Sequence, residues 1–189
     1  MPMTHHMMKT SNHTIPDWLK LQELTHEMDR YRWNILGLCE MRLKNFGETT
    51  TDEGHKVFFS RNEDKHEHGT EFLIHKDIVN TVMGCHSVSS RLITIRLRAV
   101  PFNITIAQAY APKSGYDDIE IEEFYDQLQN VIDQTPKKDI LVVQDDWNVK
   151  VGRDACGNWQ GICGPFCNDD TNERDSDFWS VPPLTILCW

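Results

Sequence analysis

Polar side chains with useful chemistry follow several apolar runs in this sequence. Glu40 follows the run at residues 33–39, Tyr110 closes another run, and Asp146 and Asn148 follow a third. Short apolar runs are typical of buried strands, and ligands of layered α/β proteins bind where strand ends open into a crevice. We therefore expect these four side chains to converge at a common edge.

The four side chains together would suit the hydrolysis of a phosphodiester. The Glu40 carboxylate could hold a Mg²⁺ ion that keeps most of its waters and takes one phosphate oxygen. Asp146 could orient an attacking water, while the Asn148 amide and the Tyr110 hydroxyl donate to the charge that develops on phosphorus. Carboxylates after strands are also common in turns, so spacing alone leaves a structural and a catalytic interpretation open.

Helices and strands must position these groups. Apolar residues at helical spacing predict helices over residues 17–31 and 117–133. Apolar runs predict strands over residues 33–39, 57–60, 71–74, 78–83, 91–98, 102–110 and 139–144. Strands 91–98 and 102–110 form a predicted hairpin, in which Leu92 is expected to share a face with the other apolar residues of its strand. The order of the elements indicates a layered α/β domain.

Three motifs carry a resemblance to a known family. They are, in chain order, Asn34-Ile-Leu-Gly-Leu-Cys-Glu40, then Gln108-Ala-Tyr-Ala-Pro112, then Asp146-Trp-Asn148 followed by Lys150-Val-Gly152. The chain resembles the endonuclease/exonuclease/phosphatase superfamily over about residues 20–175, and more narrowly the apurinic-type endonuclease domain of non-LTR retrotransposons. The resemblance implies a layered α/β sandwich that cleaves DNA with Mg²⁺ or Mn²⁺.

The same resemblance implies a role for each polar side chain. Glu40 would bind the divalent metal, and Tyr110 would contact the scissile phosphate. Asp146 would orient the attacking water, and Asn148 would bind the phosphate. A phosphatase that acts on small phosphoesters is the alternative within the superfamily, but the sequence around the Tyr-Ala-Pro and Asp-Trp-Asn motifs favours a nuclease.

Two parts of the family pattern are missing from this sequence. Residues 1–16 contain no Thr-Trp-Asn strand, and no histidine follows His86 to form the family's Ser-Asp-His motif. We therefore expect an incomplete sandwich, without its first strand and C-terminal half: a disordered tail at 1–16, a partial domain at 17–175 and an aberrant tail at 176–189. That last tail has no periodicity, and a frameshift is our hypothesis for it. One sheet would lack its packing partner and favour self-association through its exposed face.

Three substitutions weaken the catalytic interpretation. Asp145 stands where the family has glycine, Glu71 stands in a predicted core strand, and Asp175 replaces the glycine of an Asn-Glu-Arg-Gly sequence. A like charge about 4 Å from a phosphate costs about 4 kcal/mol at an effective dielectric constant of about 20, so Asp145 would weaken phosphate binding. A second metal ligand at Asp145 is less favoured, because adjacent strand residues point to opposite faces.

The composition limits the partners of the chain. Nineteen Lys and Arg against twenty-nine Asp and Glu give a net charge of −10, so binding to DNA would require a local basic patch. The candidates for that patch, with an ordinary solvated surface as the alternative, are Arg91, Arg96, Arg98, Lys137, Lys138, Lys150 and Arg153. No apolar run reaches the roughly 18 residues of a membrane span and no signal peptide is recognised, so we expect an intracellular protein, nuclear if functional.

These observations predict a retrotransposon-derived, Mg²⁺-dependent endonuclease-like fragment with little or no activity. Catalytic residues act as a unit, so losing one of them can cost nearly as much activity as losing all. DNA is the expected ancestral substrate, and no membrane contact is expected. The alternative is a non-catalytic remnant or a protein-interaction module with the same partial fold.

Overall fold

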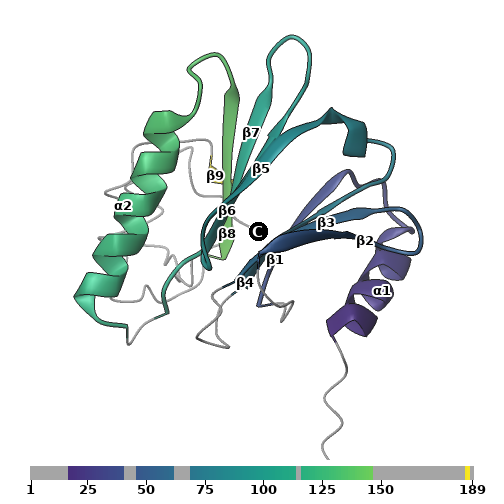
Figure 1. The fold of residues 1–189 in the computed structure, drawn as a ribbon, viewed down its shortest axis with the longest axis horizontal. Helices are drawn as coiled ribbons and strands as arrows, with labels where there is room; N and C mark the ends of the chain where they lie inside the picture. Colours follow the sequence, from purple (N-terminus) through teal and green to yellow (C-terminus); the bar gives the residue numbers. More distant parts are fainter. Residues whose placement is uncertain (1–16, 41–45, 62–68, 114–115, 147–185, 188–189) are drawn as a thin grey trace, which may run out of the picture. The chain divides into compact units, whose positions relative to one another are not determined.

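The computed structural model describes residues 17–40, 46–61, 69–113, 116–146 and 186–187 (Figure 1). The chain divides into two compact units, residues 1–32 and 33–189, and each is described by itself. The first unit contains helix α1, Asp17–Met28, which ends three residues earlier than predicted. No helix in the described ranges is long and apolar enough to cross a membrane.

Several predicted features lie outside the described residues. They are the tail at 1–16, Asn148, Lys150, Arg153, Asp175 and most of the tail at 176–189. Within that last tail, the structure describes only a two-residue strand, β9, Ile186–Leu187. The sequence predicts no strand at these two residues, because they belong to no alternating apolar pattern. They form a strand by pairing with residues 143–144, which are distant in the chain.

The first sheet of the second unit has four antiparallel strands in the order β1-β4-β3-β2. Its strands are β1 (Ile35–Cys39), β2 (Gly47–Thr50), β3 (Lys56–Arg61) and β4 (Gly69–Ile74). Strand β4 has a neighbour on each side and is buried along its whole length, including Glu71, which the sequence placed in a core strand. Strand β2 was not predicted, because it lies at the edge and is mostly exposed, and no apolar pattern marks it.

The second sheet has five strands in the order β5-β6-β7-β8-β9. The first four are β5 (Val82–Ser89), β6 (Leu92–Leu97), β7 (Ile104–Tyr110) and β8 (Ile140–Asp146). Strands β6 and β7 pair antiparallel, which confirms the predicted hairpin, while β8 runs parallel to β7. The strand predicted over 78–83 is wrong, since residues 79–81 form a 3₁₀ turn and β5 begins after it.

The two sheets face each other across an apolar core (Figure 1). Phe72 and Ile74 of β4 pack there against side chains of the second sheet. The partners from the second sheet are Ile93, Ile95, Leu97 and Ile106. The expectation that one sheet would lack its packing partner is therefore wrong, because strands within residues 33–110 already supply two matching apolar faces.

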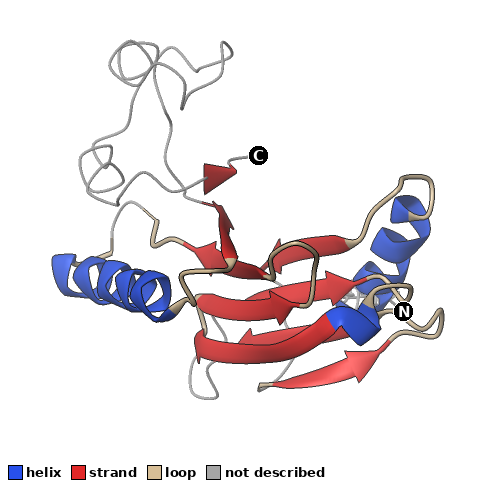
Figure 2. Ribbon diagram, turned by 90° about the horizontal axis from the view of Figure 1, so that it is seen from above, coloured by secondary structure: helices blue, strands red, loops and turns tan. Residues whose placement is uncertain are grey.

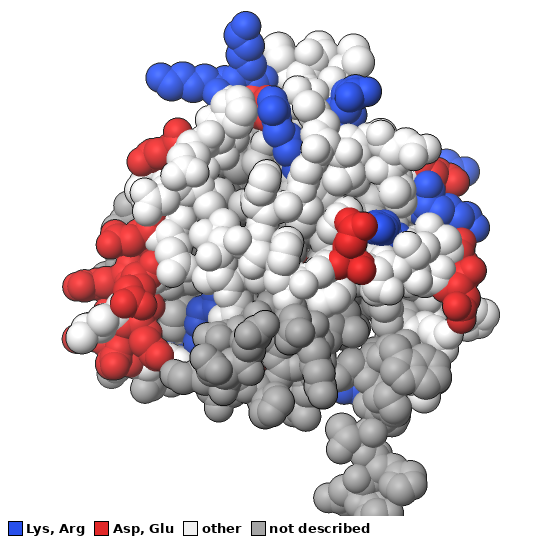
Figure 3. All heavy atoms as spheres, viewed as in Figure 1, with Lys and Arg blue, Asp and Glu red and all other residues white. Residues whose placement is uncertain are grey.

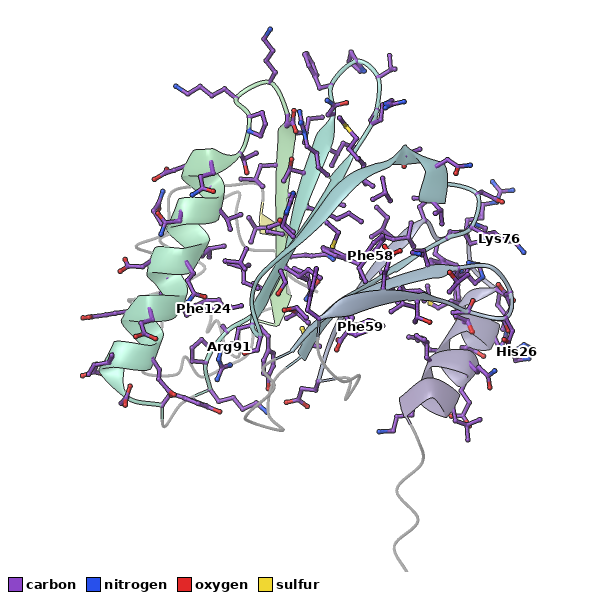
Figure 4. All side chains as sticks on the ribbon, in the orientation of Figure 1. His26, Phe58, Phe59, Lys76, Arg91 and Phe124 are labelled. Atoms are coloured by element: carbon purple, nitrogen blue, oxygen red, sulfur yellow. The ribbon has the colours of Figure 1, made fainter. Side chains whose placement is uncertain are left out.

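Helix α2, Asp118–Gln134, covers the other face of the second sheet (Figures 1 and 2). Phe124 points from the helix toward the sheet (Figure 4) and packs in a second apolar cluster with Leu128 and Leu92. The prediction for Leu92 is thus wrong: it faces α2, whereas Ile93 and its alternate neighbours face the first sheet. Because α2 connects two parallel strands, the unit contains a β-α-β crossover and the predicted α/β class is confirmed.

Candidate functional site

Glu40 and Tyr110 come from different sheets and meet at one edge of the sandwich. Glu40 directly follows β1, and Tyr110 is the last residue of β7. The Tyr110 hydroxyl donates a short hydrogen bond to Oε1 of Glu40. The Lys113 ammonium donates to the same oxygen at 2.7 Å. Two of the four predicted side chains therefore touch, although they lie 70 residues apart in the chain.

The backbone of Asp146 lies beside this pair. Asp146 is the last residue of β8, and in the parallel register it is the partner of Tyr110. Neighbouring strands are about 4.8 Å apart, so the backbones of Tyr110 and Asp146 are adjacent. Asn148 lies outside the described residues. The expectation that polar residues at strand ends share one edge thus holds for Glu40, Tyr110 and the backbone of Asp146. The catalytic roles of the four residues stay predictions.

Glu40 has a backbone conformation that is unusual for its residue type. Its φ is 63°, in the left-handed region, and its amide donates to the Gly69 carbonyl at 2.9 Å. A residue other than glycine pays roughly 1–2 kcal/mol in this region, and such conformations cluster at functional sites. The turn that directs the Glu40 carboxylate toward Tyr110 is therefore maintained against a local cost.

Arg91, which directly precedes strand β6 (Leu92–Leu97), contacts the end of β7. The Tyr110 amide donates to the Arg91 carbonyl at 2.8 Å, and the Arg91 guanidinium donates to the Tyr110 carbonyl at 3.3 Å. The same guanidinium lies 5.6 Å from the Tyr110 ring centroid and 4.7 Å from that of Tyr116, within cation–π range. Figure 4 shows Arg91 near this end of the second sheet.

The hydroxyl of Tyr110 is kept protonated. Tyr110 is only 1% exposed, and this burial, together with the hydrogen bond to Glu40, raises the pKa of its hydroxyl above the usual value. The hydrogen bond to Glu40 likewise raises the pKa of the Lys113 ammonium. At neutral pH the protonated Tyr110 hydroxyl and the charged Lys113 ammonium therefore both donate hydrogen bonds to the Glu40 carboxylate.

Sequence reasoning missed Lys113 and found Arg91 only as part of a basic set. Lys113 directly follows the Tyr-Ala-Pro motif, and that adjacency was the one available signal. The basic set is not one patch: Arg91 lies at the site, whereas Arg96 binds Asp139 through both carboxylate oxygens, at 2.6 and 2.9 Å, near the opposite end of the sheet. Sequence could not separate the two, because both are arginines of the same predicted strand.

Acidic residues dominate a neighbouring surface. Helix α2 carries six Asp or Glu residues and no Lys or Arg. Figure 3 shows acidic side chains gathered over this helix, at the left of the view. Such a surface repels a polyanion.

The Glu40 carboxylate at this edge is exposed and compatible with a hydrated magnesium ion. Mg²⁺ is commonly bound through one or two carboxylates and keeps several waters, and the Glu40 side chain is 59% exposed to solvent. Within the described part of the chain, no group of three or more His, Cys, Asp or Glu side chains could hold a metal. A closed structural zinc site of four protein ligands is thus not found among these residues, whereas Glu40 suits a water-rich magnesium ion.

Comparison with known proteins gives one clear likeness. The chain is similar to craniofacial development protein 2. It is 33% identical to that protein of Bos taurus and 31% identical to that of Tragulus javanicus, in each case over 167 residues and 88% of this chain. The chain spans less than a third of these relatives, 28% and 29% of their lengths respectively. No protein-family model matches it.

Proposed function

We propose that this chain is an endonuclease-like domain of the endonuclease/exonuclease/phosphatase type, derived from a retrotransposon, with DNA as its ancestral substrate. The observation that carries the proposal is the contact between Glu40 and Tyr110, which joins the ends of two sheets. The register that sets Asp146 beside Tyr110 supports it further. Glu40, Tyr110 and Asp146 are three of the four residues to which the resemblance gives a catalytic role.

In the proposed reaction each residue has a separate task. Glu40 would hold a hydrated Mg²⁺ or Mn²⁺, which would neutralise charge on the phosphate when bound. Tyr110 would donate a hydrogen bond from its hydroxyl group to a phosphate oxygen, and Asn148 would donate one from its side-chain amide N–H. Asp146 would accept a hydrogen bond from the attacking water and align it with phosphorus.

We expect the activity to be weak. Asp145 adds a carboxylate next to Asp146 in the sequence, and a second negative charge opposes an incoming phosphate. The net charge of −10 and the acidic surface of α2 reduce the affinity for DNA further. The location that fits this function is intracellular and, for an active protein, nuclear.

A non-catalytic interaction module is the second candidate. A groove of about 540 Å³ runs between β2 and β5, the edge strands of the two sheets, and exposes Phe46 and Met83. Exposed apolar side chains next to open strand edges favour association. The partner that fits this surface is a second copy of the chain, so size-exclusion chromatography with light scattering would show a dimer if this candidate is correct.

Nicking of supercoiled plasmid with Mg²⁺ or Mn²⁺ tests the proposed function. The purified chain is compared with Glu40→Gln and Asp146→Asn, and with Lys76→Gln as a control, an exposed lysine that follows β4 at the end of the first sheet remote from Glu40. Slow nicking that both site variants abolish and the control retains supports an active nuclease. Rapid nicking with the same dependence overturns the expected weakness. Nicking that no site variant changes comes from a contaminant and contradicts the proposal.

A further inference from the structure

Oε1 of Glu40 accepts two hydrogen bonds at once. One comes from the Tyr110 hydroxyl and the other from the Lys113 ammonium, at 2.7 Å. A carboxylate oxygen offers two lone-pair positions, and these donors use both of them on this atom. A metal ion that coordinates Oε1 must therefore displace one of the two donors.

Lys113 is the donor that leaves more readily. The Tyr110 side chain is almost fully buried at the end of β7, whereas the Lys113 side chain is 51% exposed. An exposed ammonium exchanges its carboxylate for water at little cost, but withdrawing a buried ring would open the space between the sheets. The pair that a metal would break is thus Lys113 and Glu40.

The chain between Tyr110 and Lys113 keeps the ammonium near this carboxylate. Ala111 is buried, and Pro112 has a fixed φ, so the two connecting residues have little freedom. The Lys113 ammonium also lies 5.5 Å from the centroid of the Tyr110 ring, within cation–π range. A carboxylate and an aromatic ring therefore both attract the cation to one place.

We propose that Lys113 is a built-in competitor of the divalent metal for Glu40. Its ammonium is bound to Oε1 of the carboxylate that a metal would use, so the two positive charges compete for one carboxylate and each cation weakens the binding of the other. Lys113 then sets the metal concentration at which the site fills. This inference rests on the proposed metal-binding role of Glu40 and adds a residue that tunes it.

Binding of Mn²⁺, followed by electron paramagnetic resonance of the free ion, tests the inference without any activity assay. We expect Lys113→Met to bind Mn²⁺ about two- to fivefold more tightly than the unchanged chain, the range that loss of an exposed ion pair allows. Lys113→Arg keeps the charge and should bind as the unchanged chain does. Lys137→Met removes an exposed lysine away from the site and should leave the affinity unaltered.

Glu40→Gln and the double variant Lys113→Met/Glu40→Gln separate this inference from the proposed function. Both should lose the same class of binding, since the lysine acts only through Glu40. Equal affinities for Lys113→Met and the unchanged chain, with binding still lost in Glu40→Gln, overturn the competition but leave the metal site standing. Binding that is absent, or that does not depend on Glu40, overturns both. A gain as large in Lys137→Met as in Lys113→Met also overturns the competition, and circular dichroism verifies that each variant is folded.

Discussion

The layer between the two sheets has two ends of opposite character. Along β7, the side chains that face the first sheet begin with Ile104 and Ile106 and continue with Gln108 and Tyr110. Strand β8 repeats the change, since Val142 packs against the apolar core while Gln144 lies beside β1. One end of the layer is therefore a hydrocarbon core, and the end next to Glu40 is polar.

The two ends contribute different things to the molecule. The apolar end removes large side chains from water, which is the main source of stability in a small domain. At the polar end, the Gln108 amide donates to the Cys39 sulfur and to the Ala109 carbonyl, each at 3.1 Å. Such hydrogen bonds add little net free energy, but their direction fixes positions. Stability and the placement of the site are thus supplied by separate regions.

Phe72→Ala is the most damaging change that we expect at the apolar end. Phe72 is fully buried between the sheets, and its removal should lower the free energy of unfolding by about 3–5 kcal/mol, through lost burial and the cavity left behind. Urea denaturation measures the loss. Phe102→Ala, at an exposed position, should change it by less than about 0.5 kcal/mol. Similar losses for both variants would show that the core is not where stability resides.

Gly37→Ala probes how closely the sheets approach at the polar end. A Cβ at Gly37 would lie 1.7 Å from Oε1 of Gln108 and 2.2 Å from Nε2 of Gln144, so both amides must move. Overpacking of this kind costs about 1–3 kcal/mol. Gln108→Ala should offset part of that cost in the double variant, which a double-mutant cycle in urea detects. Gly84→Ala is the control, because its nearest neighbour, at 3.5 Å, is at ordinary contact distance.

A strictly additive cycle would contradict the close approach of β1 to β7. In that case the cost of Gly37→Ala would arise from the strand itself rather than from Gln108. The polar end would then be looser than the apolar end, and the division between stability and placement would fail.

Lowering the pH should reduce the stability of the apolar end, because this end contains the buried carboxylate of Asp139. Asp139 precedes β8, its side chain is 2% exposed, and it accepts hydrogen bonds from Arg96 and Thr105. The Arg96 guanidinium holds the pKa of this carboxyl below its usual value. The resulting stability is present above the pKa of the unfolded chain and is lost as the pH falls through the lower folded value.

Thermal unfolding between pH 7 and pH 2 measures this contribution. Asp139→Asn should be less stable than the unchanged chain at pH 7, and its stability should fall less steeply in acid. The effect should be smaller than that of Phe72→Ala, since only one ion pair is involved. Parallel pH profiles for the two chains would show that Asp139 is equally stabilised in the unfolded state.

The sequence predicted the elements that have a strong local pattern. Helix α2 has an apolar stripe that includes Phe124 and Leu128, and the structure buries both. Strands β7 and β8 are apolar runs, and each lies within two residues of its predicted bounds. Strand β2 and the 3₁₀ turn before β5 have no such pattern: pairing with β3 defines the strand, and short-range backbone hydrogen bonds, such as that from the Thr81 amide to the Ile78 carbonyl, define the turn. The packing of the two sheets was also missed, because the expectation came from the resemblance rather than from the residues.

The candidate site was predicted in outline for the same reason. Glu40 and Tyr110 follow or end apolar strands, and polar residues at strand ends tend to share an edge. Lys113 has no periodicity and no motif of its own, and only the three-dimensional turn after Pro112 brings its ammonium to Glu40. The polar side chains beneath the site were hidden for another reason: in β7, Gln108 occupies a position that alternation assigns to the core.

Gln144→Leu is the smallest change we expect and the most direct test of the polar end. The Nε2 atom of Gln144 is buried and has no hydrogen-bond partner among the described residues. An unsatisfied buried amide costs about 1–3 kcal/mol, so a leucine of similar size should leave stability unchanged or raise it by up to about 1 kcal/mol. Gln108→Leu is the matched change, and it should lose about 1 kcal/mol because it removes two hydrogen bonds. Urea denaturation measures the free energy of unfolding of both variants. Equal losses would mean that the Gln144 amide is as well hydrogen-bonded as that of Gln108. The polar end would then stabilise the fold as well as position Glu40 and Tyr110.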